Sequence, residues 1–272
     1  MSINEVPVGT VQLTRVGYVD VTINPARVGL TPAQIASVPW AEPLWAAGDG
    51  LRAGAAVWVI QDGDARIAVD PAQAADEIIR TDADASVHQE AFAALLESAG
   101  MPRESFTHAI ATHMEGIGMW AWRNDDGSWA PFFPNAPILV SQRELDAVDR
   151  GEHPSPVHRA FTQLRALGAL QAVDDGHKVT EHVSLEHVGG HTPGHQFVRI
   201  QSGDATAVMV GHVAVTALHL VTGPCPQQHP CPDVAQARIE TLLTEDAVLI
   251  GPLWPQPGAG RWDGEKLVAV GG

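Results

Sequence analysis

The residues best suited to chemistry are a histidine and a glutamate that stand where an apolar run ends. In the stretch Phe106–Trp120, apolar residues give way to His113 and Glu115, and glycines follow. Residues i and i+2 of an extended segment point to the same side, so these two side chains can converge on one point. Imidazole and carboxylate groups bind divalent cations, and they also transfer protons near neutral pH. The pattern therefore indicates a metal site or an acid–base site at the end of a buried strand.

This stretch resembles the Thr-His-x-His-x-Asp-His motif of the metallo-β-lactamase superfamily, with several letters changed. Gly190–His195 is similar to the second histidine motif of that family, and the apolar run that ends at His212 stands where the family has a strand ending in Gly-Asp. Val69–Pro71 matches an early strand ending in Asp, and Leu249–Gly258 resembles the closing segment of the lactonase and organophosphate-hydrolase branch.

The resemblance covers residues 50 to 265 in the expected order, and it implies an α/β fold with four layers, an αββα sandwich. It also implies an enzyme that is hydrolase-like, with an ester or lactone as its substrate.

The resemblance further implies a degenerate metal site. By position, His113, Glu115 and His191 would hold one metal, and His212 replaces the bridging Asp of the family. The ligand positions of the second metal carry Ile117, Gly118 and Leu253, whose side chains have no lone pair to offer. We therefore expect no binuclear centre, and either one zinc, iron or manganese ion or no metal.

Three functions remain open on this evidence. With one metal on His113, Glu115, His191 and His212, the chain would be a hydrolase. Without a metal, Glu115 and the histidines could act as acid and base in an isomerase, a lyase or a cyclase. The third alternative is a binding protein with no catalytic activity. In each case the expected partner is a small, partly apolar organic molecule.

Residues around these groups are expected to orient them or to line a pocket. The resemblance places Asp70 behind the metal ligands, where it would orient an imidazole such as that of His113 or His191. His195 is expected to be a structural hydrogen-bonding residue. Apolar and aromatic residues near the motifs predict an apolar pocket wall. The predicted wall consists of Met114, Ile117, Trp120, Trp122, Leu253 and Trp254.

The elements that must position these groups can be predicted from local patterns. Two apolar runs around Asp62-Gly63 predict a β-hairpin, and Ser141-x-x-Glu144 is a capping-box pattern that predicts the start of a helix. Strand and helix then alternate around His113, as in a βαβ unit with its functional loops at strand ends. Further strands are predicted over residues 10–16, 18–23, 137–140, 179–188, 196–200, 206–213 and 247–251, and further helices over 85–100, 157–170 and 233–244.

Residues 1–50 are predicted to form N-terminal strands and an arm that packs on the core, and residues 51–272 the metallo-β-lactamase-like domain, within a single domain overall. In the lactonase branch a similar extension helps to form the dimer and the pocket, so the resemblance implies a homodimer. A plain surface excursion is the alternative for this arm.

Composition argues against several classes of partner. The formal net charge is −16 at pH 7, so no cationic surface is expected for nucleic acid or for an anionic membrane. No apolar run is long enough to cross a bilayer and the N-terminus lacks a signal pattern, so we expect a cytoplasmic protein. Cys225 and Cys231 are expected to be free thiols, with a local disulfide as the alternative.

Overall fold

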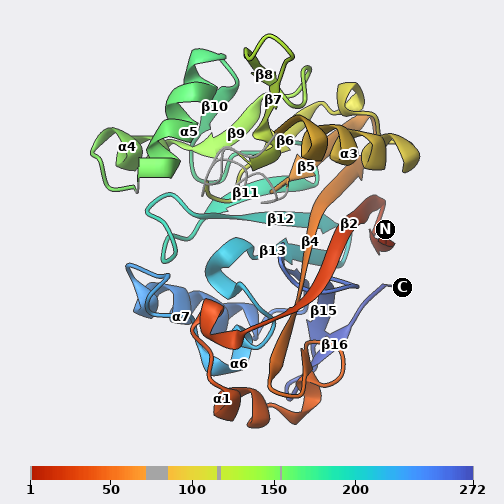
Figure 1. The fold of residues 1–272 in the computed structure, drawn as a ribbon. Coiled ribbons are helices and arrows are strands. Elements are labelled where there is room, and N and C mark those ends of the chain that lie inside the picture. Colours follow the sequence, from red (N-terminus) through yellow and green to blue (C-terminus); the bar gives the residue numbers. More distant parts are fainter. Residues whose placement is uncertain (1, 72–84, 115–117, 154, 272) are drawn as a thin grey trace.

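The computed structural model describes residues 2–71, 85–114, 118–153 and 155–271. Two β-sheets face each other, and helices cover the outer face of each sheet (Figure 1). This arrangement is the predicted four-layer αββα sandwich. Within the described residues no helix is long and apolar enough to cross a membrane.

The first sheet has eight strands in the order β1-β2-β4-β5-β6-β9-β10, with β3 paired to β4. Its first part is antiparallel, whereas β5, β6, β9 and β10 run parallel to one another. Parallel strands need crossover connections, and α3, α4 and α5 provide them on the outer face. The strands are β1 (Ser2–Val8), β2 (Val11–Ile23), β3 (Ala46–Ala47), β4 (Gly50–Asp62), β5 (Ala65–Val69), β6 (His108–Ile110), β9 (Ile138–Ser141) and β10 (Leu170–Val173).

The second sheet has six strands in sequence order. Its strands are antiparallel except for β13 and β14, which are parallel and are joined through α6 and α7. The strands are β11 (Val183–His187), β12 (Gln196–Ser202), β13 (Ala205–Met209), β14 (Val248–Ile250), β15 (Ala259–Trp262) and β16 (Leu267–Ala269). A separate hairpin joins β7 (Ala121–Arg123) to β8 (Trp129–Pro131).

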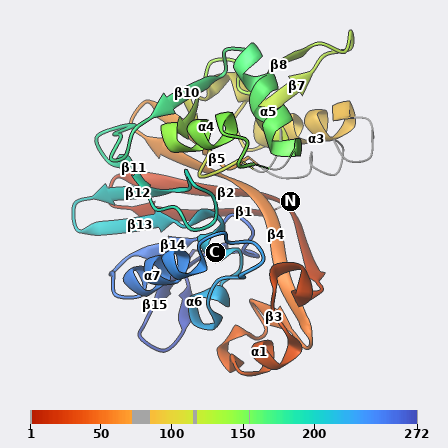
Figure 2. The same cartoon turned by 90° about the vertical axis from the view of Figure 1, so that its left-hand side faces the viewer.

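Helices lie above and below the two sheets, as both views show (Figure 2). The α-helices are α1 (Pro32–Ala36), α3 (Ala85–Ser98), α4 (Gln142–Asp149), α5 (Ser155–Ala166), α6 (His219–Thr222) and α7 (Pro232–Leu242). The 3-10 turns are η1 (Pro25–Val28), η2 (Pro39–Ala41), η3 (Arg103–Ser105), η4 (Gly118–Trp120) and η5 (Gly211–Ala214).

The hydrophobic core has three layers because successive residues of a strand face opposite sides of its sheet. In β5, Ile67 and Val69 pack between the two sheets, and Ala68 between them faces the helices α3, α4 and α5. In β13, Ala207 and Met209 lie in the same central layer, whereas Val208 faces the side of α6 and α7. Both sheets are therefore buried on two faces wherever a helix covers them.

Most of the predicted elements are present, with shifted ends. The β4–β5 hairpin and α3 are confirmed. The prediction was wrong at Gly17, where β2 continues through a bulge instead of breaking into two strands. It was also wrong at Leu170, which begins β10 after α5 has ended. The edge strand β1 and the C-terminal strands β15 and β16 were not predicted.

The predicted capping box at the start of α4 is only half correct. Ser141 is the N-cap residue, and its hydroxyl accepts a hydrogen bond from the backbone N–H of Arg143 at 3.2 Å. Glu144, the expected second half of the box, is fully buried and accepts from the backbone N–H of Gly194 at 2.8 Å. A tertiary hydrogen bond has thus replaced the local one.

The first 50 residues contribute to both sides of the sandwich. β2 pairs along its length with β4, and η1, α1 and η2 pack on the hydrophobic layer that covers the second sheet. Trp45 at the end of this arm meets Trp254 edge-on, with ring centroids 5.7 Å apart, and both rings are buried. The Trp254 indole N–H donates to the carbonyl oxygen of Ala214 at 2.9 Å.

Replacing Trp45 with Ala should destabilise the fold by about 3–5 kcal/mol, because it leaves a cavity against Trp254. Chemical denaturation followed by circular dichroism measures this loss. The control is Trp129→Ala in the β7–β8 hairpin, where the ring is only half buried and the expected loss is less than half as large. Equal losses for the two variants would contradict the packing of the arm on the core.

Candidate functional site

Three histidines from separate parts of the chain come together at one point. His113 lies three residues beyond β6, His191 lies in the loop between β11 and β12, and His212 lies in η5 after β13. One ring nitrogen from each lies within 4.8 Å of the others. Their exposed fractions are only 7%, 9% and 4%. Loops that follow strands of both sheets thus supply one buried cluster of imidazoles, which we call the histidine cluster.

The rings of this cluster are packed against one another. The centroid of the His113 ring is 4.3 Å from that of His212 and 4.7 Å from that of His191. His195 stacks on His113 at 5.2 Å with an interplanar angle of 22°. The ring of His229 meets that of His191 at 5.1 Å. Five imidazoles therefore share a small, nearly dry volume.

A short chain of hydrogen bonds orients His113. The carboxylate of Asp70 accepts from the backbone N–H of Thr112 at 2.9 Å and from its hydroxyl at 2.6 Å. The oxygen of that hydroxyl lies 3.0 Å from Nδ1 of His113. The hydroxyl proton goes to Asp70, so the His113 nitrogen donates and its Nε2 keeps a lone pair. Asp70 was predicted to orient an imidazole such as that of His113, and it reaches this ring through Thr112.

His195 packs against the histidine cluster, but its ring nitrogens are not among the three that converge. Its Nε2 accepts a hydrogen bond from the backbone N–H of His212 at 3.1 Å. Complete burial, followed by the neighbouring imidazoles, holds the pKa of His195 well below its ordinary value. The ring is therefore neutral and fixes the start of η5. Gly211 permits this contact, because a Cβ there would lie 2.4 Å from Nε2 of His195 and φ is +51°.

His229 was not predicted as a site residue, and the structure places it against the cluster. Its Nδ1 lies 2.7 Å from the carbonyl oxygen of Cys225, and its Nε2 lies 3.0 Å from that of His212. The ring thereby ties the loop before α7 to the turn that carries His212. A Pro-rich loop gave no pattern that could indicate this contact, because the partners are backbone carbonyls. Cys225 and Cys231 are both free thiols, as expected.

Glu144 joins the two loops that carry His113 and His191. Beyond its bond to Gly194, its carboxylate faces the backbone N–H of Met114 and the hydroxyl of Thr192. Burial raises the pKa of Glu144 to about 7 in spite of these three donors. The backbone of α4 also touches the turn closely, because a Cβ on Gly194 would lie 2.2 Å from the Glu144 nitrogen.

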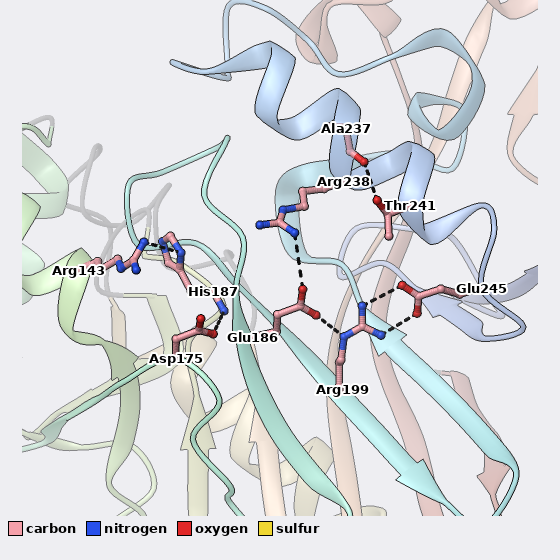
Figure 3. A network of polar contacts seen from close by, with 9 residues as sticks. All are labelled: Arg143, Asp175, Glu186, His187, Arg199, Ala237, Arg238, Thr241 and Glu245. Carbon is pink, nitrogen blue, oxygen red and sulfur yellow. Dashed lines mark hydrogen bonds and ion pairs between the residues drawn. The ribbon is translucent and has the colours of Figure 1, made fainter.

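The outer side of the same turn is held by a second polar network (Figure 3). Arg143 donates to Nδ1 of His187 at 2.9 Å, and Nε2 of His187 donates to the carbonyl oxygen of Pro193 at 2.8 Å. Farther along β11 and β12, Glu186 bonds to Arg199, which also makes a two-pronged contact with Glu245 at 2.7 and 2.9 Å (Figure 3). Adjacent residues of α4 therefore hold the turn from both sides.

A pocket of about 440 Å³ opens beside the histidine cluster, with His191 in its wall. Most of the other lining groups are apolar or uncharged. The lining residues are Met114, Glu152, His153, Val157, His191, Thr192, Pro193, Pro226, Gln227, Gln228, His229 and Pro230. The volume suits a small organic molecule.

The residues predicted to line the pocket lie in different places. Met114 lines it, whereas Trp120 and Trp254 are buried in the hydrophobic layers outside the two sheets. Trp122 stacks under the guanidinium of Arg103 at 4.3 Å, and Leu253 packs on the second sheet's outer layer.

Three positions of the first histidine motif remain to be placed. Glu115 and Ile117, predicted as a ligand and as a pocket residue, lie outside the described residues. Gly118 begins the turn η4.

The residues present fit a single divalent cation. Three imidazole nitrogens are the donor set of many zinc sites, and nitrogens that share one zinc lie roughly 3.4 Å apart. The observed separations, all within 4.8 Å, need only small ring rotations to reach that value. Within the described residues no other group of three histidines, cysteines or carboxylates converges in this way.

The chain has the metallo-β-lactamase fold, as its motifs predicted. No protein-family model and no curated protein sequence matches the chain.

Solved structures are similar over nearly its whole length. A hydrolase described as AbOPH of the β-lactamase superfamily has a TM-score of 0.75 at 17% identity and covers 98% of this chain and 97% of its own. AidC, a dizinc quorum-quenching lactonase in complex with a homoserine product, has a TM-score of 0.73 at 17% identity over 99% and 97%. A probable metal-dependent hydrolase from Staphylococcus aureus has a TM-score of 0.71 at 16% identity over 97% of both chains.

Replacing Thr112 with Val should weaken zinc binding about 10- to 100-fold, because the side chain keeps its shape but no longer links Asp70 to His113. Competition with a chromophoric chelator measures the affinity. Thr112→Ser keeps the hydroxyl and should bind zinc nearly as the wild type does. A Val variant with wild-type affinity would show that the link has no effect on the ligand.

The buried carboxyl of Glu144 makes stability depend on pH. Its pKa is raised to about 7 by burial, so the folded state holds the proton more tightly than the unfolded state, and stability falls as pH rises from 5 to 8. The expected loss is about 2–3 kcal/mol relative to a Glu144→Gln variant, which has no carboxyl to ionise. Urea denaturation of both proteins at several pH values measures the difference. A difference that stays constant between pH 5 and 8 would contradict the raised pKa.

Proposed function

We propose that this protein is a hydrolase of small, partly apolar esters or lactones that uses one divalent cation. The observation that carries the proposal is the convergence of buried nitrogens from His113, His191 and His212 beside a pocket. Three protein ligands, which leave further coordination positions open, are the pattern of catalytic rather than structural zinc sites. The similar solved structures include a dizinc lactonase, which supports hydrolysis as the reaction class.

When bound, the cation would supply Lewis acidity that polarises the carbonyl group of the substrate. The chain itself would hold and orient the reacting groups. Asp70 and Thr112 fix the ring of His113, and His195 and His229 fix the backbone on either side of His212. Because the rings are nearly dry, they can keep these positions without competition from bulk water.

The pocket suits an uncharged substrate better than an anionic one. Glu152 lies in the lining, the described lining residues include no Lys or Arg, and the whole chain has a net charge of −16. An anion would thus meet repulsion on approach. Proline and methionine side chains offer apolar contact, and the amides of Gln227 and Gln228 can bond to a neutral polar group.

A single cation is proposed because of residues that the family resemblance aligns with the second metal site. Ile117, Gly118 and Leu253 have no donor atoms in their side chains. The neutral imidazole of His212 would replace a bridging carboxylate, so less negative charge is available to hold two cations together.

Metal analysis of protein purified without chelator, followed by assay on a panel of esters and lactones, tests the proposal. The expected result is about one equivalent of zinc, iron or manganese per chain, with hydrolysis that chelation abolishes and the metal restores. His191→Ala should lose both metal and activity. The control is His158→Ala, because this histidine is exposed on α5 and should change neither.

Two metals per chain, or hydrolysis that survives complete removal of metal, would contradict the proposal. In the second case the metal-free acid–base alternative would replace it. The homodimer predicted from the family resemblance stays a prediction.

A further inference from the structure

A buried ionisable pair borders the pocket, and one member of it, His153, has no part in the site described so far. His153 lines the pocket together with His191. Its Nε2 lies 3.5 Å from Oε1 of Glu144, and the side chains of the two residues are only 4% and 0% exposed. A buried carboxylate beside an imidazole at the wall of a pocket is an arrangement that can move protons.

The carboxylate of Glu144 is anchored through its other oxygen, which leaves Oε1 on the side of His153. The N–H of Gly194 bonds to Oε2 at 2.8 Å, and the N–H of Met114 and the hydroxyl of Thr192 also face the carboxylate. Oε1 is the oxygen left for His153. An imidazole that directs Nε2–H toward this oxygen keeps its lone pair on Nδ1.

Among the described residues of the pocket wall, the other ionisable groups are engaged elsewhere. Glu152 forms an ion pair with Arg150 at 2.6 Å. Both nitrogens of His229 face backbone carbonyls, and His191 belongs to the histidine cluster. Burial also lowers the pKa of His153, so that its ring is neutral at pH 7 and can accept a proton.

We propose that His153 is a catalytic acid–base residue of this pocket and that Glu144 is the positioning residue that orients it. This inference rests on the proposed hydrolase function and assigns the proton transfers within it. Glu144 would thereby act on two parts of the site, since it also braces the loops of His113 and His191.

The proposed step balances as the hydrolysis of an ester by one water molecule. The oxygen of water forms a bond to the carbonyl carbon while His153 takes a proton from it. The bond between this carbon and the leaving oxygen then breaks, and its electron pair goes to that oxygen. His153 returns its proton there, so the products are a carboxylic acid and an alcohol, and the imidazole is neutral again.

Two esters of the same acid test this role, because their leaving groups differ in their need for a proton. The p-nitrophenolate of p-nitrophenyl butyrate leaves without protonation, whereas the ethoxide of ethyl butyrate requires it. The variants are His153→Gln and Glu144→Gln, each assayed as the metal-loaded full chain for kcat/KM on both esters. His158→Gln on the exposed side of α5 is the control. Metal content and circular dichroism are measured for every protein.

For His153→Gln, kcat/KM should fall on both esters because the base for the attacking water is lost, about tenfold on p-nitrophenyl butyrate and about 100-fold or more on ethyl butyrate, whose leaving group also loses its acid. Glu144→Gln should lower kcat/KM per bound metal ion about tenfold more on ethyl butyrate than on p-nitrophenyl butyrate. His158→Gln should match the wild type on both esters.

Equal losses on the two esters, with normal metal content, would overturn the role of His153 and leave the proposed hydrolase intact. If His153→Gln fails to fold, the ratio of the two rates for Glu144→Gln decides in the same way. A wild-type protein that binds metal but hydrolyses neither ester would overturn the proposed function, and this role with it.

Discussion

The buried carboxylate of Glu144 connects the parts of the site that come from distant regions of the sequence. It accepts a hydrogen bond from the backbone N–H of Gly194 in the turn that follows His191, and it faces the backbone N–H of Met114, next to His113. A carboxylate in so dry a place is costly unless donors surround it, so its position and theirs depend on each other. The helix α4 therefore contacts both histidine loops through Glu144 and holds them together.

The histidine cluster is held in place mainly by hydrogen bonds to the backbone or to a small side chain. Thr112 relays Asp70 to His113, while His195 and His229 hold the backbone of His212 from two sides. Such supports orient a ligand before any cation binds. The result is a preorganised set of three imidazole donors.

The sequence predicted those features of the site that depend on residues close together in the chain. Most strands could be predicted from period-2 patterns, whereas the fold and the two histidine motifs were predicted from the resemblance to a known family. Glu144 was predicted as part of a capping box, and its real partner, Gly194, is fifty residues away. Trp120 and Trp254 are pocket-like in sequence but serve as packing, because only the tertiary structure decides which face an aromatic ring covers.

The most direct test of this account is a crystal structure of the zinc-loaded protein with anomalous diffraction data collected at the zinc edge. The account predicts one anomalous peak per chain, within bonding distance of ring nitrogens from His113, His191 and His212. Two peaks roughly 3.5–4 Å apart would establish a binuclear centre and contradict it. A single peak bound elsewhere would show that the histidine cluster is not the metal site.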